Sequence, residues 1–438
     1  MNIRRLCISV SLALLAIELP LHGGVVAQSS AIDATLAYQY FQEAQALCSR
    51  DQGKLWGIQL CGPMLFVDPK TRMVVANQPD SEGILTKSGN VFIGKLPATV
   101  NIANTAVDWA GVKWTMIIFP LPEDKYRRTN LMAHELWHRV QNEIGFPSSG
   151  AANNHLDTRD GRVWLQLEWR ALAAALSSGG KHRRRAITDA LLFRNYRRAI
   201  FPQAAAEERQ MEMHEGLAEY TGVRLSGSPN LDQYVVDGDL KEAANKQTFV
   251  RSFAYATGPA YGILLDKTGR NWRQGLKKED SLEVLLQQAF AIKLPQDIKH
   301  AAAERARIYN GDKLQASENE RENDRQKLLA AYRAKLVDGP VLAIPLQQMS
   351  MQFNPGNLLP LDSLGTVYPD IRVVDVWGIL TVTKGALINP TFSQIYISAP
   401  DNLNASPLQG DGWTLELKAG WTVAAGGRSG DYGIKRMD

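Results

Sequence analysis

His134-Glu135-Leu136-Trp137-His138 is the stretch around which the middle of the chain is organised. Its apolar neighbours recur with a helical period, so Leu131 to Ile144 is predicted to form a helix that Gly145 ends. A helix places residues i and i+4 on one face, so His134 and His138 can offer two imidazole nitrogens to one metal ion. The stretch therefore predicts a helix that carries part of a metal site.

Glu135 lies one step around this helix from His134, where its carboxylate reaches a water on the metal rather than the metal itself. The order His-Glu-x-x-His is that of zinc peptidases. A chance match in a chain of this composition is on the order of one in a hundred. On this stretch alone, a surface helix with two unrelated histidines stays an alternative.

A catalytic zinc needs a third protein ligand and one open position. The segment Met213-His214-Glu215-Gly216-Leu217-Ala218-Glu219-Tyr220 offers a glutamate on a predicted helix, Ala204 to Leu225. Here the chain resembles the gluzincin class of metallopeptidases, in particular the aminopeptidase-N-like branch with its Asn-Glu-Gly segment and following aromatic residue. The resemblance implies that Glu215 is the third ligand. As in thermolysin-like members, it also implies that Glu219 hydrogen-bonds a zinc-bound histidine; a solvated helix carboxylate is the alternative.

Tyr255-Ala256-Thr257-Gly258 resembles the Tyr-x-x-Gly segment of the same branch. The resemblance implies that the Tyr255 hydroxyl stabilises the oxyanion that develops during acyl transfer. A tyrosine in a helical region is often a core residue instead, and Tyr261 is a rival for the role.

The chain also departs from that family. The gap between His138 and Glu215 is much longer and holds two additional predicted helices, Val163 to Leu176 and Ala186 to Ile200. Rival ligands therefore stay open: Glu168 on the first of these helices, and Glu212 and His214 beside Glu215. No Gly-x-Met-Glu-Asn segment is present to hold a free amino terminus, so exopeptidase activity is not supported.

The patterns along the chain predict an α+β fold in which a mainly helical region lies between a small N-terminal sheet and a C-terminal all-β domain. The resemblance implies that the helical region is a zincin-like catalytic domain. A helix near Ala31 to Cys48 is followed by strand signals, including a hairpin of Leu65–Val67 with Met73–Val75. After Gly339 the composition becomes poor in charge and rich in Val, Ile, Thr, Gly and Pro. The expected regions are 28–338 for catalysis, divided into a sheet at 28–125 and helices at 126–338, and 339–438 for the β domain.

The first residues have the charged, apolar and small-residue order of a secretory signal peptide, expected over 1–27. An uncleaved membrane anchor is the alternative, although Glu18 and Pro20 interrupt the short apolar run. Export to the periplasm or the exterior would expose Cys48 and Cys61 to an oxidising compartment. A disulfide between them and two separate buried thiols are both open.

The composition of the 438 residues, 45% hydrophobic and 21% charged, is that of a globular protein, and a net charge of +4 indicates no particular partner. The basic run Lys181 to Arg185 is interpreted as a solvated turn, so no nucleic-acid partner is expected. Glu318 to Val337 is expected to be a long, mostly solvated helix. The polar loop Asn153 to Asp160 either lines the substrate cleft or caps the next helix through Asp160, and capping is preferred. No later segment is apolar enough to insert stably into a membrane, and the oligomeric state stays open.

These features lead us to expect a secreted zinc-dependent metallopeptidase that acts on peptides or proteins. One alternative is a secreted binding or scaffold protein with a structural or vestigial zinc site, and another is a zinc hydrolase of non-peptide substrates. Vestigial members commonly lose the general base, so the presence of Glu135 favours the enzyme.

Overall fold

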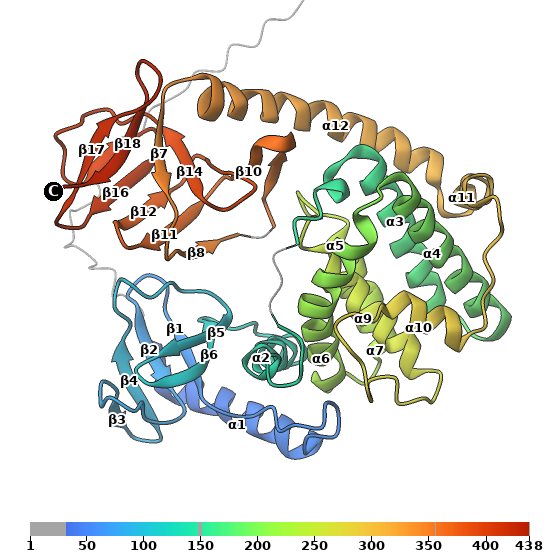
Figure 1. The fold of residues 1–438 in the computed structure, drawn as a ribbon. Helices are drawn as coiled ribbons and strands as arrows, with labels where there is room; N and C mark the ends of the chain where they lie inside the picture. The colour runs from blue at the N-terminus through green and yellow to red at the C-terminus, as the bar shows by residue number, and fades with distance from the viewer. Residues whose placement is uncertain (1–31, 148–150, 355, 438) are drawn as a thin grey trace, which may run out of the picture. The chain divides into compact units, whose positions relative to one another are not determined.

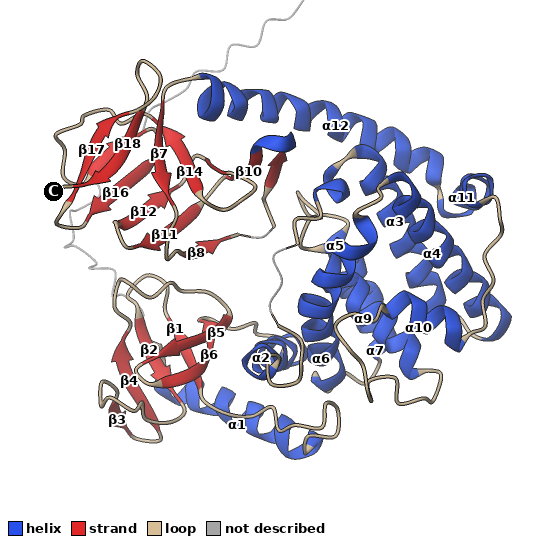
Figure 2. Cartoon of the chain, in the orientation of Figure 1, coloured by secondary structure: helices blue, strands red, loops and turns tan. Residues whose placement is uncertain are grey.

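The computed structural model describes residues 32–147, 151–354 and 356–437. It confirms the α+β class, with a sheet near the N-terminus, a helical middle and an all-β C-terminal region (Figures 1 and 2). The expected signal peptide, residues 1–27, lies outside the described residues. Within the part of the chain that is described, no helix has both the length and the apolar composition needed to cross a bilayer.

The N-terminal region packs helix α1 (Ala34–Asp51) against a six-stranded sheet of order β3-β4-β2-β1-β6-β5. The predicted hairpin is confirmed as the antiparallel pair β1 and β2, while β1 and β6 run parallel. The rings of Phe41 and Phe66 stack with centroids 4.5 Å apart, which joins α1 to the sheet. The strands are β1 (Met64–Val67), β2 (Met73–Ala76), β3 (Thr86–Ser88), β4 (Val91–Lys95), β5 (Thr105–Trp109) and β6 (Val112–Ile118).

A disulfide joins Cys48 to Cys61, which decides between the two states that the sequence left open. It links the last turn of α1 to the segment that leads into β1. The end of the helix is thereby tied covalently to the sheet.

In the helical region, helix α2 packs along α6, and α6 packs along α9. Helices α3 and α4 pack against each other along most of their length. Segments α5, η2 and α6 follow one another without a break, as the prediction of one helix from 204 to 225 required, but η2 is a π-helical turn. The bounds are α2 (Lys125–Val140), η1 (Asn154–Asp157), α3 (Arg159–Leu176), α4 (Gly180–Ile200), α5 (Ala204–Met211), η2 (Glu212–Gly216), α6 (Leu217–Leu225), α7 (Leu231–Tyr234), η3 (Val235–Leu240), α8 (Lys241–Ala243), α9 (Phe253–Asp266), α10 (Leu282–Ala289), α11 (Ile298–Ala306), η4 (Arg307–Tyr309), α12 (Gly311–Arg333) and η5 (Ala334–Asp338).

Two local interpretations of this region were wrong. Residues 181–185 form the start of α4 instead of a turn, because exposed basic side chains hide the helical period that apolar residues would show. Helix α3 is capped by Thr158, whose hydroxyl accepts from the Gly161 amide at 3.1 Å, and not by Asp160. The prediction of a long, mostly solvated helix is confirmed by α12, although Glu318 itself is buried and pairs with Arg162 at 2.5 Å.

The C-terminal region has two sheets of its own, with strand orders β17-β18-β7-β14-β13-β10-β9 and β15-β16-β12-β11-β8. Its core includes the fully buried Trp377, Leu380 and Leu415. The bounds are β7 (Val341–Pro345), β8 (Ser350–Phe353), β9 (Leu359–Leu361), η6 (Asp362–Leu364), β10 (Gly365–Tyr368), β11 (Ile371–Asp375), β12 (Gly378–Val382), β13 (Ala386–Ile388), β14 (Gln394–Ser398), β15 (Leu408–Gly410), β16 (Trp413–Leu417), β17 (Trp421–Ala425) and β18 (Tyr432–Arg436).

Candidate metal centre

Helix α2 brings two histidines to one face. It begins after Asp124, whose side chain accepts from the Arg127 amide at 2.8 Å, so it starts about one and a half turns before the predicted Leu131. Within it, the Nε2 atoms of His134 and His138 lie 3.0 Å apart. Both imidazoles therefore converge on one point beside the helix.

Glu215 supplies a third ligand atom from the π-helical turn η2. Its Oε2 lies 3.6 Å from His134 Nε2 and 3.4 Å from His138 Nε2. Zinc binds such atoms at about 2.0–2.1 Å in tetrahedral geometry, which places the ligand atoms about 3.3 Å from one another. The three atoms therefore fit zinc as they stand, and they form the metal-binding group found among the described residues.

Each histidine has an acceptor behind it. Nδ1 of His134 lies 2.8 Å from Glu219 Oε2, and Nδ1 of His138 lies 2.8 Å from Gln141 Oε1. Asn130 in turn donates to the other Glu219 oxygen at 2.8 Å. An acceptor at Nδ1 fixes the proton there and leaves the Nε2 lone pair for a metal. Glu219 therefore lies where it can orient His134 by accepting from its Nδ1.

The ligand carboxylate of Glu215 is held at both oxygens. Arg251 donates to Oε1 at 2.9 Å and the Tyr255 hydroxyl donates to Oε2 at 2.7 Å. Burial opposes a charge on this carboxyl, yet the neighbouring imidazoles of His134 and His138 hold its pKa well below the usual range. Glu215 is therefore ionised, which is the form that binds a metal.

Tyr255 lies directly over the centre. Its ring stacks on His134 with centroids 5.4 Å apart and an angle of 9° between the planes. Burial and the neighbouring Glu215 charge raise the pKa of the phenol well above its usual value, so the hydroxyl keeps its proton. It is a hydrogen-bond donor placed beside the oxygen that faces the metal position.

Glu135 stands next to this group without binding to it. It lines a pocket together with His134 and Tyr255. Its buried Oε2 has no hydrogen-bond partner among the described residues. Burial raises the pKa of its carboxyl, so the group readily takes up a proton. A buried carboxylate with a free oxygen beside a metal position is suited to proton transfer.

The rivals named from the sequence are engaged elsewhere. Glu168 binds Arg194 and Arg197, each at 2.7 Å, and accepts from the Tyr261 hydroxyl at 2.9 Å. Glu212 pairs with Arg194 through both oxygens. Neither carboxylate faces the histidines, and the Tyr261 hydroxyl belongs to Glu168 rather than to the metal position.

His214 lies closer but does not join the ligand group. Its ring centroid is 5.0 Å from that of His138. Its Nδ1 lies 3.5 Å from Glu215 Oε1, whereas His134 and His138 are near the other oxygen, Oε2. Burial lowers its pKa to about 4, so the ring is neutral at physiological pH.

Three residues of the centre escaped the sequence reasoning. Asn130 lies four residues before His134, and Gln141 lies three residues after His138. Helical spacing could have found both, because residues three or four apart share a helix face. Arg251 lies outside the predicted helices and carried no comparable signal.

Comparisons of the chain with protein-family models, with curated proteins and with solved structures found no match. The ligand set, the buried acid and the phenol of the centre come from three neighbouring helical segments: α2, η2 and α9.

Proposed function

We propose that the chain is a zinc metallopeptidase, exported to the periplasm or the exterior, that hydrolyses peptide bonds in peptide or protein substrates. The observation that carries the proposal is the convergence of His134 Nε2, His138 Nε2 and Glu215 Oε2 within 3.6 Å of one another. A site with three protein ligands and an open fourth position is typical of catalytic zinc, whereas structural zinc has four.

Zinc bound there would supply a Lewis acid that polarises the scissile carbonyl and makes a water more acidic. Glu135 would take the proton of the attacking water and deliver it to the leaving amine. The Tyr255 hydroxyl, which donates to Glu215 Oε2 in the structure, would give its one hydrogen bond to the developing oxyanion when substrate is bound. Each of these residues already lines the same pocket.

Two further observations support parts of the proposal. The Cys48–Cys61 disulfide fits an oxidising compartment, as export requires. The gluzincin resemblance supports a peptide substrate, and the contacts of Glu215 and Glu219 with the histidines, and of Tyr255 with Glu215, are compatible with that resemblance. No Gly-x-Met-Glu-Asn segment is present, so internal peptide bonds are the proposed targets.

The proposal is tested with zinc-loaded protein and unfolded casein as substrate. We expect cleavage that a chelator abolishes and that added zinc restores. Glu135→Gln should keep its zinc but lose activity by a factor of about 10²–10⁴. The matched control is Glu143→Gln, an exposed position shortly after α2, which should cleave like the wild type.

Two results would contradict the proposal. Full activity in Glu135→Gln would remove the general base from the scheme. Zinc-loaded wild-type protein without chelator-sensitive cleavage would favour a binding protein instead.

A further inference from the structure

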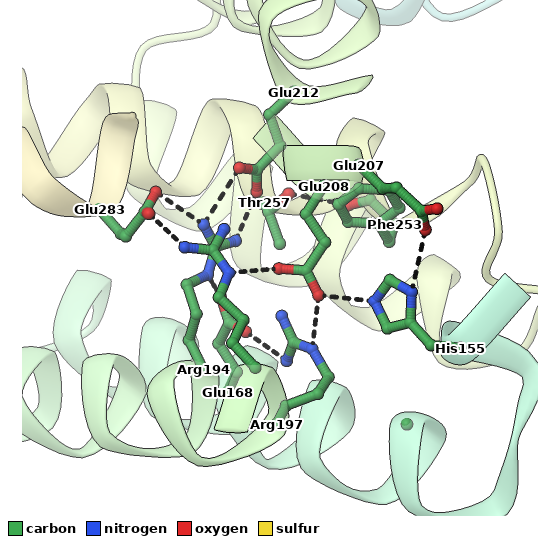
Figure 3. A network of polar contacts seen from close by, with 12 residues as sticks. His155, Glu168, Arg194, Arg197, Glu207, Glu208, Glu212, Phe253, Thr257 and Glu283 are labelled. Carbon is green, nitrogen blue, oxygen red and sulfur yellow. Dashed lines mark hydrogen bonds and ion pairs between the residues drawn. The ribbon is translucent and has the colours of Figure 1, made fainter. Parts of the chain in front are cut away.

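A buried network of ion pairs joins the inserted helices α3 and α4 to the helix that carries Glu215 (Figure 3). Its arginines come from α4, and its carboxylates come from α3, α5, η2 and α10. Its members are Glu168, Arg194, Arg197, Arg198, Glu208, Glu212 and Glu283, with His155 at its edge.

Arg194 is the centre of this network. Its guanidinium donates to Glu168 at 2.7 Å, to Glu283 at 3.1 Å and to both oxygens of Glu212, one of them at 3.0 Å. The side chain is completely buried and lies 4.5 Å from the centroid of the Tyr261 ring. A planar fork bound on all sides has one position only, so Arg194 fixes where Glu212 lies.

Glu212 is the first residue of the π-helical turn η2, and Glu215 belongs to the same turn. A π turn contains one residue more than an α-helical turn, so it changes the direction of the side chains around it. Such turns occur frequently at functional sites. The position of Glu212 therefore bears directly on the direction of the Glu215 carboxylate.

The opposite side of η2 is also fixed. Gly216 packs so closely on Gly258 of α9 that a Cβ built on Gly258 would lie 2.3 Å from the Gly216 Cα. The same helix and the residues just before it supply Arg251 and Tyr255, which hold the Glu215 carboxylate. The turn is thus held by backbone packing on one side and by Arg194 on the other.

We propose that Arg194 is a positioning residue for the metal centre. It acts through Glu212 to set the direction of Glu215, and the α3–α4 insertion is the support that carries it. The inference rests on the zinc site of the proposed function. It explains the long gap between His138 and Glu215: the inserted helices build a fixed support behind the ligand helix.

A role in stability alone would not require this arrangement. Well-packed apolar residues often stabilise a core as well as a buried ion-pair network does, because the charges lose their hydration. What the ion pairs add is one fixed arrangement of side chains. Here that arrangement includes η2, the turn that carries the metal ligand Glu215.

The test compares two conservative changes in the same network. Glu212→Gln alters the contact between Arg194 and the ligand turn. Glu283→Gln alters contacts of Arg194 and Arg198 that come from α10, and among the described residues Glu283 has no ion pair with the turn η2 that carries Glu215. Zinc affinity is measured by competition with a chromophoric chelator on the full chain. The unfolding free energy of each zinc-free variant is measured in urea.

We expect Glu212→Gln to weaken zinc binding by about 10-fold or more, as changes behind metal ligands do. Glu283→Gln should change it by no more than about twofold while losing comparable stability. If Glu212→Gln does not fold, Arg194→Lys takes its place, because lysine keeps the charge but lacks the planar fork. The Arg194→Lys variant is expected to weaken zinc binding in the same way.

Equal effects of the two changes on zinc affinity, or unchanged affinity in Glu212→Gln, would overturn the inference while leaving the zinc site intact. Absence of zinc binding by the wild type would instead contradict the proposed function, and the inference would fall with it. The two failures are therefore distinguished by the wild-type titration.

Discussion

The two histidines of the centre are oriented by different kinds of acceptor. His134 has a carboxylate, Glu219, behind its Nδ1, whereas His138 has the neutral amide of Gln141. A carboxylate makes the imidazole a stronger ligand than an amide does, because it accepts a charge-assisted hydrogen bond. At the scale of single residues, His134 is therefore the histidine whose affinity for zinc depends most on its neighbour.

We expect Glu219→Gln to weaken zinc binding by about 10- to 100-fold, because the neutral amide raises the basicity of His134 less. The measurement is a competition titration against a chromophoric chelator. The exposed Glu304→Gln, which changes the net charge equally, is the control and should bind zinc like the wild type. Equal affinity in the two variants would exclude the supporting role of Glu219.

Tyr255 can be tested against Tyr261, its rival from the sequence. Removing the Tyr255 hydroxyl should lower kcat by about 10²-fold with zinc retained and KM little changed, because its hydrogen bond would be strongest in the transition state. Tyr261→Phe removes a buried hydroxyl that contacts Glu168 instead, so its kcat should match the wild type. A larger loss of kcat in Tyr261→Phe than in the variant without the Tyr255 hydroxyl would assign the oxyanion-stabilising role to Tyr261.

The sequence predicted most of the centre at this scale because its residues lie at helical spacings. His134 with His138, and Glu215 with Glu219, each lie one turn apart. It left Glu168 and Glu215 as rival ligands, since spacing within a helix does not tell which helices meet. Arg251 could not be found, because its contact with Glu215 depends on tertiary packing alone.

At the scale of elements, the network around α4 has a consequence for stability in acid. Burial opposes ionisation of Glu208, but Arg197 and Arg198 hold the pKa of its carboxyl well below the usual range. A carboxyl with a lowered pKa in the folded chain adds stability that is present above its unfolded pKa of about 4.3. That stability is lost as the pH falls from about 5 through the folded pKa.

We therefore expect the unfolding free energy of the zinc-free protein to decrease below about pH 5. Glu208→Gln should remove up to about 1.4 kcal/mol per pH unit from that slope. Urea unfolding at a series of pH values measures it. Zinc must be absent, because acid also releases metal from histidines. An unchanged slope in Glu208→Gln would show that its carboxyl does not titrate abnormally.

Helix positions were predicted better than helix starts. Asp124 and Thr158 begin α2 and α3 through side-chain caps that the apolar period does not reveal. The charged start of α4 was interpreted as a turn because its exposed basic side chains show no apolar period. The π turn η2 had no signal in the sequence, because its extra residue is held by contacts with α4 and α9.

At the scale of the whole molecule, the α+β class followed from changes in composition and period along the chain. Those changes are local, so they can be recognised from the sequence alone. Strand order is not local: β1 pairs with β6 in parallel and β18 pairs with β7, across long stretches of chain. Only tertiary structure decides such pairings, and the sequence reasoning made no prediction of them.

The central claim is that one chain binds one zinc ion through His134, His138 and Glu215. The most direct measurement is the zinc content of purified protein by mass spectrometry, after dialysis against metal-free buffer. We predict about one zinc per chain in the wild type and in the exposed His182→Ala control, and almost none in His138→Ala with its helical circular dichroism retained. A wild-type protein without zinc, or a His138→Ala variant with a full zinc complement, would contradict the account.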